Sequence, residues 1–151
     1  MTARAVFEAL KARGWMLATA ESCTGGMIAA AITDLPGSSA VLDRGFVTYS
    51  NAAKTEMLGV PAALIDSMGA VSEEVARAMA EGALARSQAD IAVSVTGIAG
   101  PGGSEHKPEG RVCFGLAIRG GSVHVETVEF GALGRGRVRA ATVEHAFDLI
   151  K

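Results

Sequence analysis

The fold of this chain is decided by the stretch Ile91-Ala-Val-Ser-Val-Thr-Gly-Ile-Ala-Gly-Pro-Gly-Gly103. Its first half is the most strand-like segment of the sequence and predicts a buried strand over 90–96. The strand runs directly into a cluster of glycines. Because ligands of open α/β sheets bind outside the carboxyl ends of the strands, this cluster predicts one wall of a binding site.

Two more expected strands end in the same way. The strand 15–20 leads into Glu21-Ser-Cys-Thr-Gly-Gly26, and the strand 41–49 ends within Thr48-Tyr-Ser-Asn-Ala-Ala-Lys54. Three such clusters predict one crevice lined by hydroxyl groups, backbone N–H groups and a lysine. These groups are the ones that an amide or ester hydrolase for small molecules requires.

Helices are expected between these strands. The apolar spacing predicts them over 3–12, 25–33, 52–58, 73–84 and 136–150. Thr24, Asn51 and Ser72 are the expected N-caps of three of them, because their side chains can accept hydrogen bonds from free N–H groups.

Two further strands, 111–118 and 122–130, flank Gly120-Gly121. This pattern predicts a hairpin with a primed turn. The fold class is therefore α/β: a three-layer α-β-α sandwich with a mixed β-sheet, in a single domain over 1–151.

The composition excludes several classes of function. The 151 residues are 49% hydrophobic and carry a formal net charge of -2, with no run of Lys or Arg. We therefore expect neither nucleic acid nor a membrane as a partner. No stretch approaches 18 consecutive apolar residues and the start lacks a secretory leader, so we expect a cytoplasmic protein. The many apolar residues and short helices favour a homodimer or higher homo-oligomer.

Metal and disulfide chemistry is not indicated. Cys23 and Cys113 lie far apart and show no Cys-x-x-Cys spacing. His106, His124 and His145 are scattered, with no His-x-x-x-His pair. The sequence therefore predicts no metal site, no disulfide framework and no cofactor.

Several motifs recur in one order along the chain: Thr19–Gly26, Pro36–Ala40, Arg44–Asn51 with Lys54, Gly69–Ser72 and Val95–Gly102. They resemble those of the CinA C-terminal domain family, the nicotinamide-nucleotide amidases, and the resemblance covers nearly the whole chain. The resemblance implies hydrolysis of nicotinamide mononucleotide to nicotinic acid mononucleotide and ammonia, in pyridine-nucleotide salvage and without a metal. The chain departs from the family at Leu133-Gly134-Arg135, where Gly-Asp-Arg is usual.

Amide hydrolysis at neutral pH needs a nucleophile, a base and donors for the oxyanion. Ser22 is the expected nucleophile, because it lies in the turn between a buried strand and a helix; Cys23 and Ser39 are the alternatives. Lys54 is the expected base, since a helix N-terminus and burial both lower the pKa of a lysine. Tyr49 is the third catalytic candidate, as a hydrogen-bond partner of the lysine or of the substrate carboxamide.

The remaining candidates are expected to bind substrate. They are Thr24, Gly25, Gly26, Ser39, Arg44, Thr96, Gly97, Gly100 and Arg139. The backbone N–H groups of 24–26 can face a developing negative charge, and Thr96 and Gly97 end the central strand. Arg44 and Arg139 match family positions and are candidates for the phosphate; their alternative is a solvated surface or a pair with Glu144.

The sequence thus predicts a Ser–Lys amidase that acts on nicotinamide mononucleotide. One alternative is a non-catalytic nucleotide-sensing or interaction module of the same fold, and another is an amidase for a different nucleotide carboxamide. The polar, glycine-rich segment 100–110 is a candidate lid over the site, because unstructured loops of this length are usually functional or disordered.

Overall fold

The computed structural model describes residues 2–150, and its centre is a five-stranded sheet in the order β2-β1-β3-β4-β5. The strands are β1 (Leu17–Glu21), β2 (Leu42–Val47), β3 (Ile91–Gly97), β4 (Arg111–Ile118) and β5 (Val123–Glu129). β1 lies parallel to both β2 and β3, whereas β4 and β5 continue the sheet antiparallel. The sheet is therefore mixed, as the sequence predicts.

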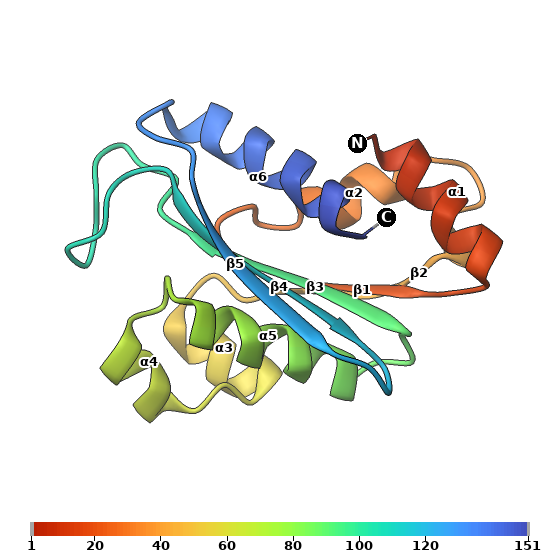
Figure 1. The fold of residues 1–151 in the computed structure, drawn as a ribbon, viewed down its shortest axis with the longest axis horizontal. Coiled ribbons are helices and arrows are strands. Elements are labelled where there is room, and N and C mark those ends of the chain that lie inside the picture. The colour runs from red at the N-terminus through yellow and green to blue at the C-terminus, as the bar shows by residue number, and fades with distance from the viewer. Residues whose placement is uncertain (1, 151) are drawn as a thin grey trace.

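Two layers of helices cover the sheet (Figure 1). The helices are α1 (Ala3–Arg13), α2 (Met27–Thr33), α3 (Asn51–Leu58), α4 (Ala62–Met68), α5 (Glu73–Ala85) and α6 (Arg135–Ile150), with a 3-10 turn at Ser38–Ala40. α1, α2 and α6 lie on one face, and α3, α4 and α5 lie on the other. This arrangement confirms the three-layer α/β sandwich.

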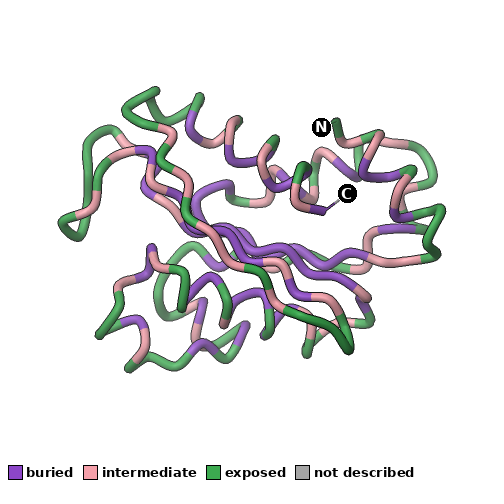
Figure 2. The backbone as a smooth tube through the Cα atoms, in the orientation of Figure 1, coloured by how far each residue is buried: buried purple, intermediate pink, exposed green. Residues whose placement is uncertain are grey.

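The hydrophobic core has two halves, one on each face of the sheet. Successive strand side chains point to opposite faces, so Val93 packs in the cluster beneath α1, α2 and α6, whereas Ala92 packs in the cluster against α5. All five residues of β1 are buried, and Figure 2 shows the buried backbone concentrated along the central strands. The rigid strands β1 and β3 therefore form the support on which the site is built. Within residues 2–150, no helix is both long enough and apolar enough to cross a membrane.

Two of the expected N-caps, Thr24 and Asn51, are wrong by two residues and one residue. The N-cap of α2 is Gly26, which has no side chain to accept a hydrogen bond, and the helix begins at Met27. Thr24 instead donates its hydroxyl proton to Glu21 Oε1, at 2.6 Å. α3 is capped by Ser50, whose Oγ accepts from the Ala53 N–H, so Asn51 is already helical. Lys54 therefore occupies the fourth helical position rather than the third.

The structure also contains two elements that the sequence pattern does not predict, α4 and the 3-10 turn at Ser38–Ala40. α4 follows Pro61 without a side-chain cap, so it lacks the usual start signal of a helix. The β4–β5 hairpin is confirmed, but its turn is not a primed two-residue turn. Only Gly120 of the two glycines has a positive φ, and Ile118 N–H bonds the Ser122 carbonyl across a three-residue loop.

Candidate active site

Three parallel strands end side by side and bring the predicted clusters together. Glu21 is in register with Val47 of β2 and with Val95 of β3. The residues that follow therefore leave the sheet at one edge, and two bonds carry the pairing past the strand ends: Ser22 N–H to the Val95 carbonyl and Thr48 N–H to the Glu21 carbonyl.

A cleft of about 330 Å³ opens at this edge. Its polar lining consists of Ser22, Tyr49, Asn51, Lys54, Thr96, Ser104, Glu105 and Arg135. The glycine-rich segment that follows β3 forms one wall, and the α4–α5 connection at Ala70 and Val71 contributes to the floor. The cleft thus joins all three clusters that the sequence singled out.

Lys54 is the central group of the cleft. Its side chain is only 1% exposed. Its Nζ lies 3.0 Å from Ser22 Oγ, 3.1 Å from the Thr48 carbonyl oxygen and 3.3 Å from the Tyr49 carbonyl oxygen. Carbonyl oxygens only accept hydrogen bonds, so a neutral amine can donate its two N–H groups to them and direct its lone pair at the Ser22 hydroxyl.

Electrostatics favour that neutral form. Burial lowers the pKa of Lys54 below its ordinary value, because an ammonium loses its hydration in the protein interior. The partners of Nζ within residues 2–150 include no carboxylate at salt-bridge distance. The pair is therefore arranged for proton transfer from Ser22 Oγ to Lys54 Nζ.

Cys23 is a poor alternative to Ser22. Its thiol is buried, and burial raises its pKa to about 11. The reactive form of cysteine is the thiolate, so at neutral pH this residue is a protonated, inert thiol. Ser22 has the base beside it, whereas Cys23 has none within hydrogen-bond distance among the described residues.

Glu21, immediately before Ser22, holds the turn in place. Glu21 is only 1% exposed, and its carboxylate accepts hydrogen bonds from the backbone N–H groups of Ile28 and Ala29, at 2.8 and 3.0 Å, and from the Thr24 hydroxyl. An acid at a helix N-terminus is stabilised by the helix dipole. This carboxylate therefore replaces the predicted Thr24 cap and ties the nucleophile turn to α2. The sequence signal that could have revealed this role is the position of Glu21, an acidic residue at the end of an otherwise uncharged, buried strand.

Arg139 supports the same turn from α6. Its Nε donates to the Cys23 carbonyl at 3.0 Å, and its Nη2 donates to the Thr24 carbonyl at 3.2 Å. Gly25 and Gly26 both have a positive φ, and Gly25 N–H bonds the Ser22 carbonyl. The turn 22–26 is thus fixed by backbone contacts, and the guanidinium lies behind it rather than in the cleft lining.

Tyr49 and Arg135 form the outer wall. The Tyr49 side chain is 62% exposed, and its hydroxyl oxygen accepts from Arg135 Nη2 at 2.8 Å. Arg135 Nη1 donates to the Gly100 carbonyl at 2.7 Å. Tyr49 therefore contacts Lys54 through its carbonyl, not through its hydroxyl. Arg135, which belongs to the Leu133-Gly134-Arg135 segment that departs from the family pattern and is not among the predicted site residues, is the arginine in the cleft.

The other strand-end candidates also lie in the cleft. Thr96, Gly97 and Gly100 are all part of its lining. The Thr96 hydroxyl donates to the Ala70 carbonyl at 2.9 Å, which ties β3 to the α4–α5 connection. That hydroxyl has used its one proton, so toward a ligand it can only accept a hydrogen bond.

Six predicted substrate-binding residues are not part of the cleft lining: Thr24, Gly25, Gly26 and Arg139 belong to the nucleophile turn or its support, and Ser39 and Arg44 lie elsewhere. Ser39 is exposed in the 3-10 turn before β2, and Arg44 is paired with Asp43 and with the Arg86 carbonyl. Both are near the amino end of the parallel strands, so the length of β1, about 16 Å for a strand of this size, separates them from the Ser22 edge. The structure does not bring either residue to the cleft. Their spacing in sequence could not reveal this, because the distance arises from strand direction.

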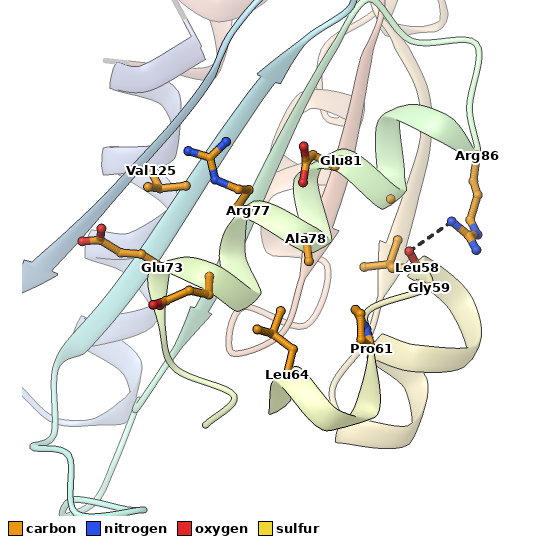
Figure 3. Close-up of a pocket in the computed structure, with 12 residues that line it drawn as sticks. Leu58, Gly59, Pro61, Leu64, Glu73, Arg77, Ala78, Glu81, Arg86 and Val125 are labelled. Atoms are coloured by element: carbon orange, nitrogen blue, oxygen red, sulfur yellow. Dashed lines mark hydrogen bonds between the residues drawn. The ribbon is translucent and has the colours of Figure 1, made fainter. Parts of the chain in front are cut away.

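A larger hollow, of about 780 Å³, lies between α5, β5 and the α3–α4 connection (Figure 3). Its lining combines acidic and basic residues of α5 with apolar residues such as Leu58 and Leu64, and Arg86 donates to the Leu58 carbonyl at its rim. Among the described residues, no serine, threonine, cysteine, histidine or lysine lines it. The hollow therefore offers glutamates but no hydroxyl or thiol nucleophile beside a base, and the smaller cleft, which contains the Ser22–Lys54 pair, is the candidate active site. Within residues 2–150, no three His, Cys, Asp or Glu side chains are grouped as a metal site.

Comparison with known proteins agrees with this architecture. A relative from Enterobacter agglomerans, named nicotinamide-nucleotide amidohydrolase PncC, is 59% identical over 81% of this chain and 75% of its own. A relative from Symbiobacterium thermophilum, named putative competence-damage inducible protein, is 63% identical over 78% of this chain but only 28% of its own length. The chain spans about a quarter to a third of several such curated relatives.

Solved structures show the same fold. The crystal structure of competence/damage inducible protein CihA from Agrobacterium tumefaciens superposes with a TM-score of 0.95, at 50% identity, over 98% of this chain and 90% of that one. A CinA superfamily protein from Escherichia coli gives 0.92 at 36% identity, over 97% and 84%. The sequence model of the CinA C-terminal domain matches residues 1–151. The chain therefore belongs to the CinA C-terminal domain family.

Proposed function

We propose that this protein hydrolyses the carboxamide of nicotinamide mononucleotide, releasing nicotinic acid mononucleotide and ammonia. The observation that carries the proposal is the 3.0 Å contact between Lys54 Nζ and Ser22 Oγ at the base of the cleft. The substrate class comes from the relative named nicotinamide-nucleotide amidohydrolase. We infer pyridine-nucleotide salvage in the cytoplasm as the setting, and a homodimer or higher homo-oligomer as the assembly.

The chemistry proceeds in two halves. Ser22 Oγ attacks the carboxamide carbon while its proton passes to Lys54 Nζ, and the tetrahedral intermediate collapses as Lys54 returns the proton to the leaving ammonia. Lys54 then takes a proton from water, and the resulting hydroxide attacks the Ser22 ester. Collapse of the second intermediate releases the carboxylate, and Ser22 Oγ regains its proton from Lys54. In both the acylation and the deacylation half, Lys54 first accepts a proton and then donates it.

The walls of the cleft suit the rest of the substrate. The exposed ring of Tyr49 offers a face on which an aromatic base can stack. Thr96 Oγ1 can accept a hydrogen bond from the carboxamide NH₂, since its own proton is held by Ala70. Arg135, at the outer end, is the cleft arginine able to meet a phosphate.

An ammonia-release assay with purified protein and nicotinamide mononucleotide tests this function. Release of ammonia together with the acid mononucleotide is the expected result. Binding without release would favour the nucleotide-sensing module instead, and release from another nucleotide carboxamide alone would change the substrate.

The two arginines near the site are expected to differ in their role: Arg135 binds the substrate phosphate, whereas Arg139 supports the nucleophile turn. Arg135→Ala is expected to raise KM for the mononucleotide about tenfold, because a charge-assisted hydrogen bond at an exposed position is lost. The dephosphorylated riboside should be hardly affected. Arg139→Ala is the matched control, since its guanidinium holds the Cys23 and Thr24 carbonyls and its loss should impair both substrates equally. The reverse pattern would assign the phosphate to Arg139.

A further inference from the structure

Glu105 places a carboxylate in the wall of the cleft. The residue lines the same cavity as Ser22 and Lys54 and is exposed to solvent. Within residues 2–150, no hydrogen bond or ion pair engages its carboxylate. The other charged side chains of the lining are Lys54, whose charge burial disfavours, and Arg135 at the outer end. The cleft lining therefore carries one negative charge that has no salt-bridge partner among the described residues, and the Lys107 ammonium, outside the lining, is an opposite charge close to it.

The loop tip holds Glu105 in an unusual backbone conformation. Glu105 and His106 have φ values of 51° and 63° and are the non-glycine residues with positive φ among those described. Residues in this region of φ are strained and cluster at functional sites. A bridge between Ser104 and Lys107 closes the tip, so the strain is compensated by local pairing.

A second set of contacts fixes the tip against the body of the domain. Lys107 Nζ donates to the Met68 and Val71 carbonyls, on either side of Gly69. A Cβ built on Gly69 would lie 3.0 Å from Glu105 Oε2 and 2.6 Å from Lys107 Nζ. The absence of a side chain at Gly69 thus lets both groups approach the α4–α5 connection. The loop tip is therefore held against the domain through Lys107, while the Glu105 carboxylate is exposed at the wall of the cleft.

The field of Glu105 reaches the reacting groups. Burial lowers the pKa of Lys54, and the negative charge of Glu105 opposes that shift. A charge that acts on Lys54 also acts on a ring bound beside it, because the Coulomb interaction depends on distance, and solvent at the exposed carboxylate keeps the effect modest.

We propose that Glu105 is a specificity-determining residue that selects amides on a positively charged heteroaromatic ring over isosteric neutral rings. The inference rests on the proposed function, in which the ring is the pyridinium of nicotinamide mononucleotide. That substrate is a zwitterion with a cationic ring and an anionic phosphate. The cleft matches it with an acidic group near Lys54 and a basic group, Arg135, at the outer end.

Binding to inactive protein tests the inference without turnover. Ser22→Ala protein is titrated with nicotinamide mononucleotide and with its benzamide C-nucleoside monophosphate, in which carbon replaces the charged ring nitrogen. We expect Glu105→Gln to weaken binding of the charged ligand about three- to tenfold and to change binding of the neutral one by less than about twofold. The preference should also decrease as ionic strength rises.

The controls distinguish charge from loop structure. Glu74→Gln removes the same charge from α5, outside the cleft, and should leave both affinities unchanged. In Ser22-containing protein, Glu105→Gln should also move the rising limb of kcat/KM to lower pH, because removal of a nearby negative charge disfavours the Lys54 ammonium.

The outcomes that overturn the inference are specific. If Glu105→Gln weakened the binding of both ligands equally, Glu105 would only shape the loop. If Ser22→Ala protein that retains Glu105 bound the two ligands equally well, a charge-based selection would be excluded. Failure of the Ser22 protein to release ammonia would instead refute the proposed function. The binding comparison would still decide the role of Glu105, because it does not depend on turnover.

Discussion

Ser22→Ala is expected to reduce ammonia release at least ~10³-fold, because it removes the attacking oxygen and leaves Lys54 without a hydroxyl to deprotonate. The fold should remain intact. Ser22 is 7% exposed, and among the described residues its side chain makes one hydrogen bond, to Lys54, so the loss of the hydroxyl costs about 0.5–1.5 kcal/mol. For a domain of this size that is a fall of only a few degrees in Tm. Steady-state kinetics measure the expected loss of ammonia release, and thermal unfolding of the same preparation measures the expected small change in Tm.

Two neighbouring variants make this result interpretable. Cys23→Ala should retain activity, because its thiol has a pKa of about 11 and is protonated at neutral pH. Ser39→Ala should also retain activity, since Ser39 lies near the amino end of β2. Full activity in Ser22→Ala together with inactivity in Ser39→Ala would mean that the nucleophile reaches the substrate in an arrangement other than this cleft.

The location of the site could be predicted from sequence because it depends on a general property of parallel strands. Strand-like runs ending in glycines and hydroxyl residues identify the carboxyl ends of β1, β2 and β3, and register brings these ends together. The Ser22–Lys54 pair follows from the same reasoning, since each residue comes shortly after a strand end. The burial of Lys54, on which part of the expected lowering of its pKa depends, does not follow from its place early in a helix and is seen only in the structure.

The details that failed depend on contacts between distant segments. Glu21 rather than Thr24 caps α2. Its buried carboxylate lies at the end of β1 and accepts hydrogen bonds from the Ile28 and Ala29 N–H groups. Arg139 faces the back of the nucleophile turn and Arg135 faces the cleft, although they lie one helical turn apart. Which face of α6 meets the site is set by packing on the sheet, and no local pattern encodes it.

Substitution of Lys54 is the second variant with a large expected effect. Lys54→Arg places a permanently charged group at this position, since the guanidinium stays protonated throughout the accessible pH range and cannot act as a base. Lys54→Met keeps the apolar stem and removes the amine. Both variants should lower kcat/KM at least ~10³-fold, because neither can accept the Ser22 proton or return it to ammonia. Lys11→Met is the control, because Lys11 lies in α1 on the opposite face of the sheet from α3.

The pH profile gives the more direct test of Lys54. An amine accepts a proton only when it is neutral, so kcat/KM should rise with pH and level off above the pKa of Lys54 in the free enzyme. Burial lowers that pKa, so the limb should lie below the ordinary lysine value of about 10.4. Nicotinamide mononucleotide should still bind to Lys54→Met, which separates a lost base from a lost fold. Substantial turnover by Lys54→Arg, or a rising limb unchanged in Lys54→Met, would exclude the lysine as base and leave a Tyr49-bound or solvent water in that role.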